Sequence, residues 1–287
     1  MAIPAWRICL ASASPEEQQH QRRLTSLLRN KQRALEARLA AMDEQERQLQ
    51  SRLQGLQRLP PPQHRLLQKI VASTMQGRTA IVAEVARASP AEKPEGVAQR
   101  SQDYVTWGAD AISVCTDEEV SPDGVLDLEA VSKAVEVPVL RKDWIIHPIQ
   151  IIDTRESGAA ALTAVYSVLS KGTPSILRYI ATVGLDAVVE VVNLKELEEL
   201  STLGIPLFGF NISVGVAVPI PGFRQDIAKS LVQKLPFGAA SIVGVASMEE
   251  ARQMKVAGAD AVYLKREALS SPQELLESLR EGLSGDD

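Results

Sequence analysis

Hydrophobic residues in the first sixty positions recur at intervals of seven. They lie in a stretch rich in Gln, Arg and Glu, and they are Leu28, Leu35, Met42, Leu49 and Leu56. Spacing of this kind places the apolar side chains on one stripe of a helix and the polar ones on the rest of its surface. The pattern therefore predicts a long amphipathic helix over residues 15–59.

A second apolar stripe beside the first is incomplete. The positions that would form it are Thr25, Gln32, Leu39, Glu46 and Leu53. A strong coiled-coil dimer would fill both stripes, so three arrangements stay open: packing on the rest of the chain, an intramolecular hairpin, and self-association or binding of a protein partner through residues 15–59.

Two short segments flank this helix. Residues 1–14 contain one Arg and no acidic residue, which predicts a disordered terminus and also fits the start of an organelle transit peptide. Residues 60–68 begin with three consecutive prolines, which end the helix because proline lacks a backbone donor. We expect this segment to be a linker.

From residue 69 to residue 287, short β-branched runs alternate with longer amphipathic stretches. The expected strands cover residues 79–85, 111–115, 137–140, 160–166, 187–191, 206–210, 239–245 and 261–264. The expected helices cover residues 97–107, 126–135, 148–157, 174–183, 194–203, 223–235, 248–257 and 272–283. Eight such units predict an α/β fold, a closed (β/α)₈ TIM barrel that follows the N-terminal amphipathic helix.

A short sequence motif repeats at the start of three expected strands. Gly-Ala-Asp-Ala occurs at residues 108–111 and 258–261, and Gly-Leu-Asp-Ala at residues 184–187. Each occurrence places a glycine where a helix ends and a new strand begins. Repetition at equivalent places supports a barrel of repeating units.

Charged residues interrupt the apolar strands near their carboxyl ends. Glu190 stands within the run Ala187 to Val192, Glu84 within an earlier strand, and Lys142 directly after another. A lone carboxylate in such a strand is costly unless it meets a partner or water. In (β/α)₈ barrels these strand ends form one mouth, where we also expect Asn211. A lysine among carboxylates suits general acid–base chemistry, although a structural salt-bridge cluster would show the same pattern.

These motifs resemble those of the indole-3-glycerol phosphate synthase family. The similar segments are Ile81 to Pro90, Ala111 to Val114, and Pro138 to Ile146, which contains Leu-Arg-Lys-Asp-Trp. The resemblance extends from about Lys69 to Leu279. It implies ring closure, decarboxylation and dehydration of a carboxyphenylamino-deoxyribulose phosphate in tryptophan biosynthesis, without a metal or an organic cofactor.

The resemblance also implies roles for single residues. Lys142 would be the general acid that protonates the substrate carbonyl oxygen, and Glu190 would assist the later proton removal. Glu84 and Asn211 would orient the lysine and the substrate hydroxyls. Trp144 would form an apolar wall beside the aromatic ring of the substrate.

The chain departs from the family pattern at several charged positions. Ala86 stands where the family has a second lysine, and Ser213 where it has an arginine. Ile242 and Val243 replace a glutamate and a serine, and the loop after Pro90 is shorter. Losing a group that stabilises a transition state commonly costs about 10²-fold in rate, so we expect activity to be reduced or lost.

Phosphate recognition is altered as well. In this fold it relies on the loops after the seventh and eighth strands, where Gly244 is kept. After the eighth strand the chain has Lys265 and Arg266, which either bind the phosphate of a small-molecule substrate by charge or remain a solvated basic pair.

Composition limits the remaining possibilities. The 287 residues carry a formal net charge of −5, which argues against nucleic-acid binding, and no apolar run is long enough for a membrane span. Two cysteines, Cys9 and Cys115, suggest a reducing compartment such as the cytoplasm or the plastid stroma, without choosing between them. The three histidines lack metal-ligand spacing, so no metal is expected. The main alternative to an eroded synthase is a non-catalytic scaffold or binding protein that acts through the N-terminal helix.

Overall fold

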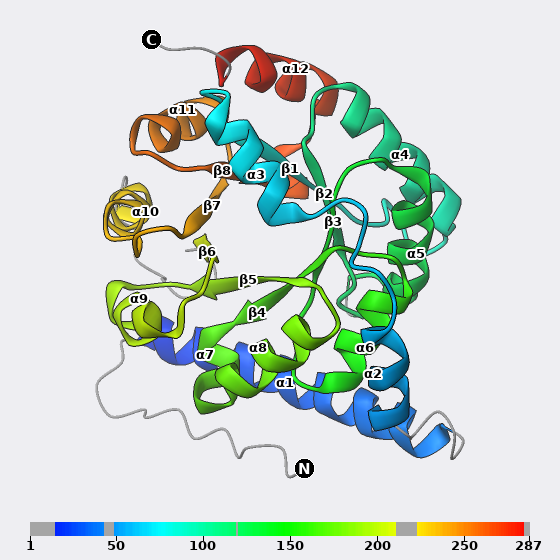
Figure 1. Ribbon diagram of the computed structural model, residues 1–287. Coiled ribbons are helices and arrows are strands. Elements are labelled where there is room, and N and C mark those ends of the chain that lie inside the picture. Colours follow the sequence, from blue (N-terminus) through cyan, green and yellow to red (C-terminus); the bar gives the residue numbers. More distant parts are fainter. Residues whose placement is uncertain (1–14, 43–48, 119, 211–222, 284–287) are drawn as a thin grey trace.

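Eight parallel strands close into a barrel in the order of the sequence, and helices surround it (Figure 1). The computed structural model describes residues 15–42, 49–118, 120–210 and 223–283. Parallel strands need crossover connections, and here helices provide them, as the alternating sequence pattern requires. The predicted (β/α)₈ barrel is therefore confirmed.

The strands lie close to their predicted positions. They are β1 (Ala80–Val85), β2 (Ala111–Cys115), β3 (Val139–Lys142), β4 (Ala161–Val165), β5 (Asp186–Val191), β6 (Leu207–Phe210), β7 (Ala240–Val245) and β8 (Ala261–Leu264). One shift matters for the site. The third strand was expected to end at Leu140, but Arg141 and Lys142 pair with Val114 and Cys115 of β2, so Lys142 lies on the strand itself.

The outer helices follow their strands. They are α4 (Pro94–Thr106), α5 (Gly124–Ala134), α6 (Pro148–Glu156), α7 (Tyr166–Leu169), α8 (Thr173–Thr182), α9 (Leu194–Leu200), α10 (Phe223–Gln233), α11 (Met248–Val256) and α12 (Pro272–Gly282). A main apolar cluster fills the space between the strands and this ring of helices. The short helix α7, directly after β4, has no counterpart in the sequence prediction.

A further helix, α3 (Leu66–Met75), closes the floor of the barrel, where the strands begin. Leu66 and Ile70 lie four apart on one face, and both are almost fully buried. They pack in the interior cluster, which also includes Val82, Leu140, Leu207 and Tyr263. The helix begins within the segment expected to be a linker, because the open floor needs apolar side chains to cover it.

The N-terminal helices α1 (Pro15–Ala41) and α2 (Leu49–Gln57) lie on the side of the barrel formed by α6, α7 and α8 (Figure 1). Leu28 packs with Val165 and Val168, while Leu35 and Met42 belong to the main apolar cluster. The residues seven apart are thus buried against the barrel. Of the arrangements left open by the sequence, the structure shows packing on the barrel.

The repeated sequence motif has the same structural role at residues 108–111 and 258–261. Gly108 and Gly258 have φ angles of 114° and 95°, which end a helix and turn the chain into the next strand. The aspartate two residues later binds the backbone of a neighbouring strand: Asp110 accepts from the Ile81 N–H at 3.1 Å, and Asp260 from the Ser241 N–H at 2.8 Å. The motif therefore links adjacent strands of the barrel through side-chain to backbone hydrogen bonds.

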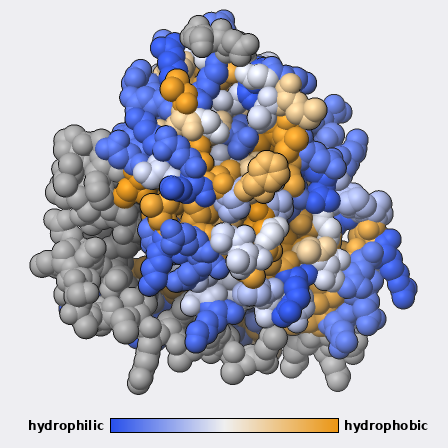
Figure 2. All heavy atoms as spheres, turned by 60° about the vertical axis from the view of Figure 1, so that its left-hand side comes forward, coloured by the Kyte–Doolittle hydropathy of each residue, from blue (hydrophilic) through white to orange (hydrophobic). Residues whose placement is uncertain are grey.

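The surface over α9, α10 and α11 is mostly hydrophilic, with apolar side chains exposed between the charged ones (Figure 2). Several of the most exposed apolar residues lie just before strands, at the floor end of the barrel, and they are Met75, Leu203, Phe237 and Val256. Within the described part of the chain, no helix has the length and apolar character that a bilayer span requires.

Candidate active site at the barrel mouth

Two of the charged strand ends meet directly. The Lys142 ammonium, at the end of β3, donates to Oε1 of Glu190 near the end of β5. Glu190 is 8% exposed and Lys142 is 19% exposed. The pair therefore lies at the mouth, with the cation partly open to solvent.

Room for Glu190 comes from the neighbouring strand. Gly209 of β6 stands opposite Glu190 in the sheet. A Cβ atom at that position would lie 2.9 Å from Cγ1 of Val188 and 3.0 Å from Cγ of Glu190, closer than packed carbon atoms allow. The glycine thus keeps the space that the carboxylate occupies.

Glu84 reaches the same mouth from β1. Its Oε2 accepts from the backbone N–H of Arg266 at 3.2 Å, so the carboxylate contacts the turn that follows β8. Ala86 follows two residues later, just beyond the end of β1, and is buried. Lys142, Glu190 and Glu84 are thereby brought to one end of the barrel.

Sequence reasoning missed two further groups here, Ser113 and Tyr263. The Tyr263 hydroxyl lies 3.0 Å from Oγ of Ser113, and the Lys142 ammonium lies 6.0 Å from the centre of the Tyr263 ring. Burial raises the pKa of Tyr263 well above its usual value, and the nearby charges of Glu84 and Glu190 raise it further. Both residues interrupt apolar strands as Glu84 does, and that signal could have found them.

A second polar network supports Lys142 from the next residue in sequence. Asp143 accepts from Nη2 of Arg141 at 2.7 Å and from Oγ1 of Thr116 at 2.9 Å. Its other oxygen lies 2.8 Å from the ammonium of Lys31, on α1. Both partners of this last pair are buried, so α1 contributes a charge directly beside the strand end that carries Lys142.

Trp144 follows this network and is held in place on two sides. Its Nε1 donates to Oδ2 of Asp117 at 3.1 Å, and its ring packs against the small cluster that includes Leu28 and Val165. The indole thus lies between the mouth and α1, and its role as a wall for the substrate stays a prediction.

The remaining predicted site residues lie around the ends of β7 and β8. Gly244 is half-buried and stands opposite Tyr263 in the sheet, Lys265 is half-buried, and Arg266 is exposed. Asn211 and Ser213 lie outside the described residues. Ile242 packs in the barrel interior, whereas Val243 points outward into the helical layer.

Cys115 ends β2 near the same mouth. Burial raises the pKa of its thiol to about 12, and the charge of Glu84 adds to this effect. The thiol therefore stays protonated at neutral pH and is a poor nucleophile.

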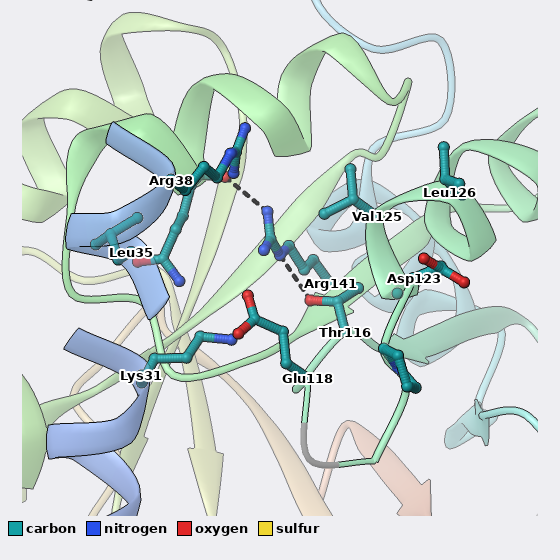
Figure 3. Close-up of a pocket in the computed structure, with 12 residues that line it drawn as sticks. Lys31, Leu35, Arg38, Thr116, Glu118, Asp123, Val125, Leu126 and Arg141 are labelled. Atoms are coloured by element: carbon teal, nitrogen blue, oxygen red, sulfur yellow. Dashed lines mark hydrogen bonds between the residues drawn. The ribbon is translucent and has the colours of Figure 1, made fainter. Parts of the chain in front are cut away.

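A separate pocket of about 270 Å³ lies between α1 and the loop that leads from β2 to α5 (Figure 3). Lys31 and Arg38 line it from α1, and Glu118 and Asp123 from the opposite side. Its cations are already paired, since Lys31 binds Asp143 and Arg38 binds Asp153 through two hydrogen bonds. Among the residues that the structure describes, no group of three or more His, Cys, Asp or Glu is arranged to hold a metal ion.

A closed barrel with an ammonium and two carboxylates at the carboxyl ends of its strands defines the class: a (β/α)₈-barrel protein whose polar groups gather where this fold carries reactive residues. The sequence profile of the indole-3-glycerol phosphate synthase family matches residues 31–281. The chain belongs to the indole-3-glycerol phosphate synthase family of the tryptophan pathway.

Individual relatives agree with this assignment. The indole-3-glycerol phosphate synthase of Rippkaea orientalis is 30% identical over 236 residues, which cover 76% of this chain and 76% of that protein. The synthase of Carboxydothermus hydrogenoformans is 30% identical over 220 residues, which cover 72% of this chain and 80% of that protein.

Solved structures show the same fold at low sequence identity. The 3-hexulose-6-phosphate synthase of Salmonella typhimurium has a TM-score of 0.59 and 16% identity over 71% of this chain and 98% of its own. The (S)-3-O-geranylgeranylglyceryl phosphate synthase of Thermoplasma acidophilum has a TM-score of 0.56 and 16% identity over 77% of this chain and 98% of its own.

Proposed function

We propose that this protein catalyses ring closure and decarboxylation of carboxyphenylamino-deoxyribulose phosphate at the barrel mouth, at a reduced rate. The observation that supports this most directly is the contact between the Lys142 ammonium and the Glu190 carboxylate. An acid and a base that touch at the open end of the barrel can donate a proton for ring closure and move a proton from carbon to oxygen for the loss of water.

Lys142 acts first in this proposal. Its ammonium protonates the substrate carbonyl oxygen while the ring carbon attacks the carbonyl carbon and the new carbon–carbon bond forms. Carbon dioxide then leaves, and the electrons of its bond to the ring restore aromaticity. We assign the last proton removal to Glu190, which takes a proton from the carbon next to the former carbonyl carbon and delivers it to the hydroxyl group that the carbonyl oxygen has become. That hydroxyl departs as water, a carbon–carbon double bond forms, and indole-3-glycerol phosphate remains.

The reduced rate follows from the charges that the chain lacks. Ala86 places a methyl group where the family has a cation, and Ile242 places a branched alkyl group where the family has a carboxylate. Both side chains are buried. Fewer preorganised charges stabilise the developing oxyanion less, at a cost of about 10²-fold for each important group. Substrate phosphate binding would rest on Gly244, Lys265 and Arg266, after the seventh and eighth strands.

The direct test gives the purified protein its substrate and follows the fluorescence of the indole product. We expect slow turnover above the uncatalysed rate, and its loss in Lys142→Ala. The matched control is Lys133→Ala, which removes an exposed lysine of α5 and should keep the wild-type rate. A wild-type protein that forms no product above background would reject the proposal.

A gain-of-function variant tests whether the remaining geometry is intact. Ala86→Lys returns a cation two residues after Glu84, and we expect it to raise kcat by about tenfold or more. An unchanged rate, in a variant that folds and still binds the product, would mean that erosion extends beyond the missing charge.

The alternative function, a scaffold that binds partners through the N-terminal helix, requires an available apolar surface on α1. Leu28, Leu35 and Met42 are each at most 9% exposed and pack on the barrel. Light scattering after size exclusion over a range of concentrations separates the two ideas. If the measured mass is that of one chain at every concentration, the helix stays packed on its own barrel. An increase in mass with concentration would favour self-association.

A further inference from the structure

Tyr263 reaches across the barrel mouth to a strand that is not its neighbour. In the sheet it stands beside Val82 of β1 and Gly244 of β7. Its hydroxyl nevertheless meets Ser113 of β2, which stands beside Glu84 of β1, two residues after Val82. The ring and the two hydroxyls thus lie beside the charged groups of the mouth.

The two hydroxyls carry two protons, but one hydrogen bond joins them. Either oxygen can be the donor in the contact of 3.0 Å. Whichever hydroxyl accepts keeps its own proton, which can be given to a third group. The pair therefore has one O–H group more than its own hydrogen bond uses.

The phenol stays neutral in this position. Burial is the main cause of its raised pKa, and the charges of Glu84 and Glu190 act in the same direction. Ionisation at neutral pH would place a third anion beside two carboxylates. Tyr263 therefore acts as a hydrogen-bond donor and not as a base.

We propose that the Ser113–Tyr263 hydroxyl pair binds an oxygen of the sugar chain of the substrate and is a substrate-contacting part of this site. The inference rests on the proposed function for the class of substrate, a sugar phosphate with carbonyl and hydroxyl oxygens. Lys142 lies 6.0 Å from the Tyr263 ring, so the same bound molecule can contact the ammonium and the hydroxyl pair. A neutral hydrogen-bond donor in the mouth supplies part of the polar contact that the methyl group of Ala86 does not.

The effect should fall on substrate affinity. A neutral hydrogen bond contributes similarly to the bound substrate and to the transition state, so its loss raises KM and leaves kcat nearly unchanged. We expect Tyr263→Phe to raise KM about tenfold. Calorimetry should also show about tenfold weaker binding of a substrate analogue whose carbonyl group is reduced to an alcohol, so that it cannot cyclise.

Two further variants separate contact from folding. Tyr104→Phe removes a buried phenol on α4, outside the barrel interior, and should leave KM and analogue affinity unchanged. Ser113→Ala should match Tyr263→Phe, and the double variant should lose no more than either single one, because the pair acts as one donor.

Each outcome has a distinct meaning. A wild-type protein that turns over substrate, with Tyr263→Phe equal to it in KM and analogue affinity, overturns this inference and leaves the proposed function standing. A lowered melting temperature without any change in analogue affinity also overturns it, since the role is then structural. A wild-type protein that neither turns over substrate nor binds the analogue overturns both proposals.

Discussion

Both ends of the barrel carry charged residues, but these residues are arranged in opposite ways. At the floor, Asp110, Asp186 and Asp260 stand at the starts of strands and accept backbone N–H groups at 2.8 to 3.1 Å. At the mouth, Lys142 and Glu190 bind each other through their side chains, and the ammonium stays partly exposed.

Asp110 shows how fully the floor charges are satisfied. Three cations approach its carboxylate at 3.1 to 3.5 Å, and they are Lys69, Arg78 and Arg280. Burial alone would raise the pKa of Asp110, but the Ile81 N–H and these cations outweigh burial and lower it. A carboxylate held in this way binds the fold together and is unavailable for proton transfer. The comparison teaches that a carboxylate at a strand end is structural where a backbone N–H and several cations hold it together, as at Asp110, and is available for chemistry where it faces an ammonium that can exchange protons with it, as at Glu190.

The largest expected effect comes from the mouth. Glu190→Gln keeps the size of the side chain and a hydrogen-bond acceptor for Lys142, but it removes the base. We expect kcat to fall by about 10² or more, with a melting temperature close to that of the wild type, because the ammonium keeps access to solvent. Retention of the wild-type kcat would contradict the role of the pair.

Asp110→Ala should have the opposite profile. Its loss removes the acceptor of the Ile81 N–H and one carboxylate partner from each of three cations, and we expect the free energy of unfolding in urea to fall by about 2–3 kcal/mol. The folded fraction should keep the wild-type KM. A change in KM without loss of stability would erase the distinction between floor and mouth.

Gly209→Ala tests how closely the mouth is packed. The added methyl group must displace Val188 or Glu190, and we expect a loss of about 1–2 kcal/mol together with a lower kcat. Gly172→Ala is the matched control, since a Cβ there meets nothing within 4 Å. Equal behaviour of the two variants would show that Glu190 tolerates displacement.

The smallest effect is a pH dependence at the floor. The pKa of Asp110 is lower in the folded than in the unfolded protein, so its stabilisation is complete above the unfolded value, about 4, and is lost as pH falls through the folded value. The stability gap between wild type and Asp110→Ala should therefore narrow in acid below about pH 4. Urea titrations at several pH values measure this gap, and a gap that widens in acid would reverse the assigned sign.

Much of the architecture was readable in the sequence because it depends on local pattern. The strands and the repeated turn motif follow from spacing along the chain, and the strands lie close to where the pattern predicts them. The stretch expected to be one helix over residues 15–59 is described as two helices, α1 and α2, and residues 43–48 between them lie outside the described part of the chain. The helix α3 was missed because its two inward residues, Leu66 and Ile70, are too few to form a recognisable stripe. Their burial depends on a hole in the barrel that exists only after the strands close.

The sequence by itself determined that this chain forms a (β/α)₈ barrel and that Glu84, Lys142 and Glu190 interrupt its strands. Tertiary structure alone decided their partners: Lys142 with Glu190, Lys31 with Asp143, and Tyr263 with Ser113, which lie 48, 112 and 150 positions apart in the chain. Helices and strands follow from the spacing of apolar and polar residues that are near one another in the chain. The side-chain pairs depend on how the barrel closes and on the register of its strands, and the spacing of neighbouring residues encodes neither closure nor register.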